Sequence, residues 1–176
     1  MLDTLLPGLS SAHNLHPMVV HFPIALWVLA FGTWCLALAR RQDLTWRLGT
    51  WFQTLALMSA LVALTMGYIA ADRLGHDSPG HDLVHVHRDY MVWTTVLSAL
   101  VTLAAWLLRN KEGGWRVGLL LASLVVVVMM TLGADRGALL VYTHGTGVSE
   151  DVLRPLPQGS HGGHDHGGHD HSGHAH

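Results

Sequence analysis

The sequence predicts an all-α integral membrane protein, a four-helix bundle of transmembrane helices followed by a disordered tail. Half of the 176 residues are hydrophobic and only 12% are charged, compared with about 25% in a soluble domain. The hydrophobic residues collect in four blocks, each close to the ~20 residues that a helix needs to cross a bilayer. These blocks lack the polar stripe that each helix of a soluble bundle carries.

The blocks occupy residues 18–39, 49–71, 90–108 and 117–134. With their connections they are expected to form one transmembrane domain, residues 1–150. The first block is too long for a cleavable signal peptide, and it lacks both a preceding basic region and a clear small-residue cleavage site. The third helix is expected to begin near "DSPG", with Asp77 or Ser78 as its cap and Pro79 in its first turn.

Basic residues predict the orientation of the bundle. The two short loops, 40–48 and 109–116, contain six of them: Arg40, Arg41, Arg47, Arg109, Lys111 and Arg116. The opposite side contains four, spread over longer segments: Arg73, Arg88, Arg136 and Arg154. Short basic loops face the cytoplasm. We therefore expect a multi-pass protein of the bacterial inner membrane with both termini outside, in the periplasm.

The fifteen histidines are unevenly distributed. All seven in the tail fall on the predicted outer side, and so do the eight others: His13, His16, His21, His76, His81, His85, His87 and His144. None falls on the predicted cytoplasmic side. The outer rim of the bundle is therefore expected to be a histidine-rich surface.

Helical periodicity separates these histidines by the face on which they lie. His21 lies on a face of small residues, which allows close helix packing in lipid, and His87 shares its face with Met91. We expect these two to point into the bundle as ligands, with His16 and His144 approaching from the helix ends. Intramembrane polar groups are costly and usually functional, although a histidine at the membrane edge can also be a simple interfacial anchor. Two acidic residues at helix ends are candidate acceptors for the imidazole N–H groups: Asp72 and Asp135.

A weak internal repeat accompanies this pattern. A shift of about 69 residues pairs His16 with His85, and it also pairs Trp46 and Arg47 with Trp115 and Arg116. Two similar helical hairpins, related by a pseudo-twofold axis along the membrane normal, would produce such a match. His85 itself lies on a face expected to form rim and lipid contacts.

The tail, residues 151–176, is expected to be disordered, because its glycine-spaced histidines and aspartates offer little to bury. Imidazole binds Zn, Cu and Ni, and such tracts are typical of metal binders. The candidate ligands are His161, His164, His166, His169, His171, His174 and His176. A tail derived from a vector, or one that drifts without selection, is the alternative.

Three stretches resemble a known family: "HPMVVHFPIAL" from residue 16, "HR" at 87 and 88, and "GADRGALLVYTHGTGV" from 133. Together they are similar to the bacterial membrane family called domain of unknown function 2231 (DUF2231), over about residues 12–148. The resemblance implies four membrane helices and recurrent histidines that map to His16, His21, His87 and His144. Members resemble domains joined to Rieske or c-type cytochrome modules, which implies redox work by analogy. This chain has neither CxxCH nor a Rieske cysteine pair.

Three classes of function follow. In the first, His21 and His87 hold a haem b or another redox metal centre, and the protein passes electrons to a periplasmic or membrane partner. In the second, His16, His21, His87 and His144 bind Cu, Zn or Ni directly for sensing or delivery. A structural membrane subunit is the third. No nucleophile–base pair or phosphate-binding loop favours an enzyme. The net charge of −2 does not suggest binding to nucleic acid. Assembly into a homo-oligomer is an open possibility.

Overall fold

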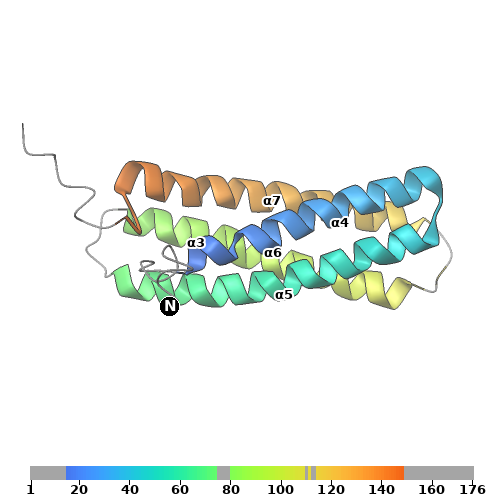
Figure 1. Cartoon of the computed structure of the whole chain (residues 1–176), viewed down its shortest axis with the longest axis horizontal. Coiled ribbons are helices and arrows are strands. Elements are labelled where there is room, and N and C mark those ends of the chain that lie inside the picture. Colours follow the sequence, from blue (N-terminus) through green and yellow to red (C-terminus); the bar gives the residue numbers. More distant parts are fainter. Residues whose placement is uncertain (1–14, 75–79, 110, 112–113, 149–176) are drawn as a thin grey trace, which may run out of the picture.

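A computed structural model describes residues 15–74, 80–109, 111 and 114–148, and within these ranges the regular structure is helical (Figure 1). The helices are α3 (His16–Val19), α4 (His21–Arg40), α5 (Asp43–Leu74), α6 (His81–Leu108) and α7 (Trp115–His144). Helices α3 and α4 together form one candidate membrane span, and α5, α6 and α7 form three more. The described residues thus confirm the predicted all-α bundle with four spans.

Successive long helices run antiparallel around the bundle (Figure 1). Helix α4 packs most extensively on α5, and α6 packs most extensively on α7, so the chain forms two hairpins. Contacts of α5 with α6 and of α4 with α7 close the bundle. Helices α4 and α6 therefore lie diagonally opposite each other, as do α5 and α7. This is the up-and-down arrangement expected when short loops join neighbouring helices.

The helices are longer than the hydrophobic blocks. Helix α5 has 32 residues and is about 48 Å long at ~1.5 Å per residue, against about 30 Å for the hydrocarbon core. Helix α7 continues past its hydrophobic block, through Asp135 and Arg136, to His144. Helix α6 begins at His81 after Gly80, whose φ of 84° is left-handed. The predicted cap residues, Asp77 and Ser78, lie outside the described residues.

The core pairs large aromatic residues with small ones. Trp34 and Trp46 are fully buried, and their rings stack with centroids 5.0 Å apart. Gly49 makes this arrangement possible, since a Cβ at that position would lie 2.4 Å from Cδ1 of Trp34. Many leucine and valine side chains instead face outward, with Leu107 68% exposed. An apolar exterior around a core of small and aromatic residues is typical of helices packed in lipid.

The middle of the bundle contains a buried polar cluster. Trp27 Nε1 donates to Ser98 Oγ at 2.9 Å, across the diagonal between α4 and α6. Gln53 Nε2 donates to the same oxygen at 3.0 Å, while Gln53 Oε1 has no partner among the described residues. The cluster ties three helices together at a depth where backbone and side-chain polar groups have no water to bind.

Candidate functional site

A cavity of about 660 Å³ opens at the end of the bundle where α3 begins and α7 ends. Its walls are mostly apolar, with contributions from Pro23, Trp27 and Met130. Its polar lining consists mainly of imidazole and guanidinium groups: His16, His21, His87, Arg73 and Arg88. No carboxylate among the described residues lines it. The cavity thus combines an apolar interior with nitrogen ligands and positive charge.

His16 begins α3 and is half-buried. Its Nδ1 lies 2.9 Å from the carbonyl oxygen of Ala63 on α5. A carbonyl can only accept, so Nδ1 carries the proton and the lone pair of the neutral ring is on Nε2. Gly67, one turn further along α5, leaves room for the ring, since a Cβ there would lie 3.0 Å from Cε1 of His16.

His87 repeats this arrangement in the second hairpin. It is half-buried on α6, and its Nδ1 donates to the carbonyl of Gly133 on α7 at 2.7 Å. A Cβ at Gly137, one turn further, would lie 3.0 Å from Cε1 of the imidazole. The acceptor lies 46 residues after the histidine here and 47 residues after it in the first hairpin. Each hairpin therefore contains a histidine, a carbonyl that fixes its tautomer, and a glycine beside its ring.

The two imidazoles face one another across the bundle. The ring centroids of His16 and His87 are 6.4 Å apart, and the ring planes are inclined by 80°. One ring comes from α3, in the first hairpin, and the other from α6, in the second. The site therefore lies between the two hairpins, at the histidine-rich end of the molecule.

This pairing corrects two expectations. His16, not His21, lies opposite His87, whereas the His21 side chain is exposed and only borders the cavity. The reason is a break between α3 and α4 at Val20, near Pro23, which has no N–H to bond the carbonyl four residues earlier. The internal repeat likewise matches His16 with His87 rather than with His85. The shift is 69 residues between Trp46 and Trp115, but 70 between the two glycines beside the rings and 71 between the two histidines. A register read at the basic end therefore does not hold at the histidine end.

The remaining predicted ligands do not join the pair. His144 is the exposed last residue of α7 and packs against Gly80, while His85 contacts His81 with their Nε2 atoms 2.9 Å apart. Among the described residues, no three His, Cys, Asp or Glu side chains gather to hold a metal ion. The structure therefore does not unite His16, His21, His87 and His144 in one site. The seven histidines of the tail, with His13 and His76, lie outside the described residues.

The predicted carboxylate acceptors are also corrected. Asp72 and Asp135 are exposed, and Asp135 forms an ion pair with its neighbour Arg136. The imidazole N–H groups bind backbone carbonyls instead. Four further residues were not predicted to belong to the site, the two glycines beside the rings and the two arginines that line the cavity: Gly67, Gly137, Arg73 and Arg88. A repeat aligned on the helices rather than on the loops would have matched the two glycines.

Comparison with known proteins agrees with this architecture. No curated protein and no solved structure matches the chain. Residues 12–150 match the family described as predicted membrane protein, DUF2231. The match covers the four spans, both histidines of the facing pair and the glycines beside them, so the chain belongs to the DUF2231 family of membrane proteins.

Proposed function

We propose that the protein is a b-type membrane cytochrome in which His16 and His87 would hold a haem. The observation that carries the proposal is the separation of the two imidazoles. A metal bound at Nε2 through a bond of about 2.0–2.1 Å lies about 3.2 Å from the ring centroid, so two imidazoles that held one metal between them would have centroids at most about 6.4 Å apart. The observed separation is 6.4 Å.

The tautomer of both rings supports the same proposal. A ligating histidine generally donates its other N–H to a carbonyl or carboxylate, which fixes the ring and raises the basicity of the ligand nitrogen. Here Nδ1 of His16 and of His87 donates to a carbonyl on the neighbouring helix. Each ring thereby carries its lone pair on Nε2, as a metal ligand requires.

The number of ligands favours haem over a bare ion. A structural or transport site for a bare Zn²⁺ ion uses about four protein ligands, and no group of three gathers among the described residues. Two axial imidazoles suffice for haem iron, because the macrocycle supplies the other ligands. When bound, the haem would carry one electron at a time between its ferric and ferrous states.

The cavity also suits this group. Its volume of about 660 Å³ lies within the ~300–1,000 Å³ of typical cofactor pockets, which are mostly apolar with a few polar anchors. Arg73 and Arg88 line it and can pair with propionate carboxylates. Arg73 has no ion-pair partner among the described residues, whereas Arg88 binds Asp89 at 3.1 Å. Arg73 is therefore the better candidate for a propionate.

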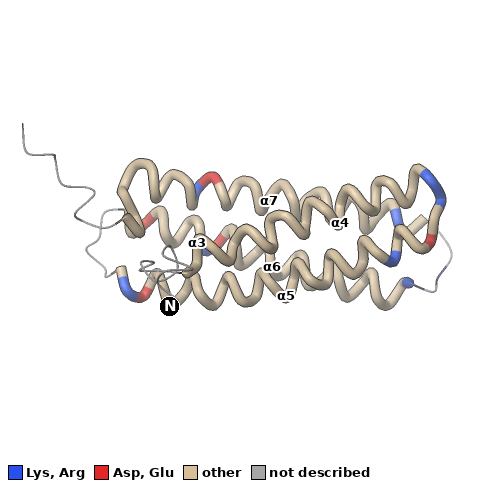
Figure 2. The backbone as a smooth tube through the Cα atoms, viewed as in Figure 1, with Lys and Arg blue, Asp and Glu red and all other residues tan. Residues whose placement is uncertain are grey.

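We propose the predicted orientation with this function. The histidine end would face the periplasm of an inner-membrane protein, so that the site could exchange electrons with a periplasmic or membrane partner. The supporting observation is the concentration of basic residues in the two short loops at the other end, which Figure 2 shows as blue segments at the right of the bundle.

A second candidate function is metal capture by the tail. Seven histidines in its last sixteen residues favour weak, multidentate binding of Cu, Zn or Ni. The tail would concentrate ions at the outer face, independently of the pair in the bundle.

The absorption spectrum of the full chain, purified in detergent from cells supplied with a haem precursor, tests the first proposal. We expect the Soret and α bands of a low-spin haem, with iron and porphyrin in equal amounts by chemical assay. Protein that takes up neither haem during expression nor hemin added afterwards would contradict the proposal.

A further inference from the structure

The opposite end of the bundle contains a second cavity, of about 620 Å³. It lies where α4 joins α5 and α6 joins α7. Four cationic side chains and one carboxylate line it: Arg47, Arg109, Lys111, Arg116 and Asp43. This cavity is thus strongly cationic, in contrast to the mostly apolar cavity at the histidine end.

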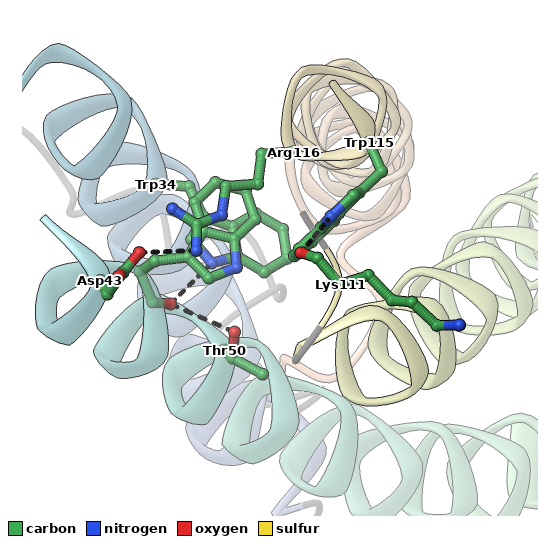
Figure 3. Close-up of polar contacts among 7 residues, drawn as sticks. Trp34, Asp43, Thr50, Lys111, Trp115 and Arg116 are labelled. Atoms are coloured by element: carbon green, nitrogen blue, oxygen red, sulfur yellow. Dashed lines mark hydrogen bonds and ion pairs between the residues drawn. The ribbon is translucent and has the colours of Figure 1, made fainter. Parts of the chain in front are cut away.

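Aromatic rings hold two of the guanidiniums in place. Arg116 lies 5.2 Å from the ring centroid of Trp46 and 5.5 Å from that of Trp115. It also pairs with Asp43 at 2.7 Å, as Figure 3 shows. Arg109 lies 5.1 Å from the ring centroid of Trp106. A guanidinium held over an indole keeps its N–H edge available for an oxygen ligand.

The backbone of Lys111 is also held by an indole. Trp115 Nε1 donates to the carbonyl of Lys111 at 2.9 Å, which ties this lysine to the first residue of the helix (Figure 3). Three of the cations, Arg47, Arg109 and Lys111, have no ion-pair partner among the described residues. The cavity therefore holds an excess of positive charge, and two of its guanidiniums are held over indole rings.

An unsatisfied donor lies in the wall of this cavity. Trp46 is 2% exposed, and its Nε1 has no hydrogen-bond acceptor within the described part of the chain. A buried N–H without an acceptor costs about 1–3 kcal/mol.

We propose that this cavity binds the phosphate group of an anionic phospholipid. Phosphate accepts paired hydrogen bonds from guanidinium groups, and basic pockets between transmembrane helices bind anionic headgroups. A lipid is favoured over free phosphate because apolar side chains flank the cavity. Leu107 is 68% exposed and Trp51 53%, so acyl chains can lie along the helices below the headgroup. This inference does not depend on the haem proposal.

Lipid retention by the full chain provides the test. The protein is incorporated into phosphatidylcholine nanodiscs that contain a minor fraction of phosphatidylglycerol, and the lipids that remain bound after extraction are identified by native mass spectrometry. We expect selective retention of phosphatidylglycerol. Arg47→Gln and Arg109→Gln should each lower it about tenfold, equivalent to about 1.4 kcal/mol. Both side chains are exposed, so neither change should impair folding.

Arg136→Gln is the matched control, because it removes the same charge at the histidine end and should leave retention unchanged. A large excess of inorganic phosphate should not displace the lipid. Displacement by inorganic phosphate would contradict a lipid as the source of the phosphate. Equal retention of both lipids, or undiminished retention in Arg47→Gln and Arg109→Gln, would overturn the site itself.

Discussion

The two ends of the bundle are made from the same four spans but differ in chemistry. At one end, two imidazoles face each other in an apolar cavity, and each is held by a carbonyl on the neighbouring helix. At the other end, guanidiniums lie over indole rings around a polar cavity. At the histidine end, the two hairpins repeat the same arrangement of histidine, carbonyl and glycine. At the basic end, the two hairpin connections differ in length.

This difference indicates that a matched geometry of the two hairpins is important at the histidine end only. Two equivalent histidines can share one ligand between the hairpins, so matched geometry is useful at their end. A site for a headgroup at the side of the bundle needs no such match.

The largest effect concerns the side of the membrane on which each end lies. With the basic end in the cytoplasm, a periplasmic reporter such as alkaline phosphatase fused after His176 should be active. The same reporter placed in the connection after Arg109 should be inactive, because the positive-inside rule keeps that loop inside. The reverse pattern of activity would show that the two ends have been assigned to the wrong sides.

The next effect concerns packing near the basic end. Gly49→Ala places a Cβ 2.4 Å from Cδ1 of the buried Trp34, and overpacking of this kind costs about 1–3 kcal/mol. We expect a lower free energy of unfolding in detergent. Gly118→Ala is the control, since a Cβ there meets nothing within 4 Å and alanine favours a helix by up to about 1 kcal/mol. Equal stability of the two variants would refute this description of the core.

A smaller effect is expected at the histidine end. Gly67→Ala and Gly137→Ala each place a Cβ 3.0 Å from Cε1 of the adjacent imidazole, which must shift by a few tenths of an ångström. We expect haem affinity to fall about tenfold in each, equivalent to about 1.4 kcal/mol. Gly32→Ala, with nothing within 4 Å, should bind haem normally. Hemin titration followed at the Soret band measures the three variants, and an effect in only one of the first two would show that the hairpins are not equivalent.

The smallest effect on the bundle should come from removal of residues 159–176. We expect an unchanged helical content and unfolding transition, together with the loss of several weak Zn²⁺ or Cu²⁺ equivalents in a metal titration. In the intact chain this binding should weaken below about pH 6, because neutral imidazole is the ligand and protons compete for it. An unchanged metal stoichiometry after truncation would show that the tail is not the metal-binding segment.

The sequence was sufficient for the four spans and for the gathering of histidines at one end. Both depend on properties that can be read along the chain: the length of each hydrophobic block, and the side of the membrane on which each connection is predicted to lie. The partner of His87 could not be predicted in this way. Periodicity assumes an unbroken helix, and the break at Val20 changes the direction of His16 relative to α4. The carbonyl acceptors, Ala63 and Gly133, escaped prediction because backbone groups leave no residue-type signal.

The most direct test of the account compares four histidine variants by absorption spectroscopy of the protein purified with haem. His16→Ala and His87→Ala should each abolish the low-spin spectrum, because each removes one axial ligand. His21→Ala and His85→Ala should preserve it, since one side chain is exposed at the rim of the cavity and the other contacts His81. A low-spin spectrum that survives in His16→Ala but is lost in His21→Ala would contradict the central claim that His16 and His87 form the site.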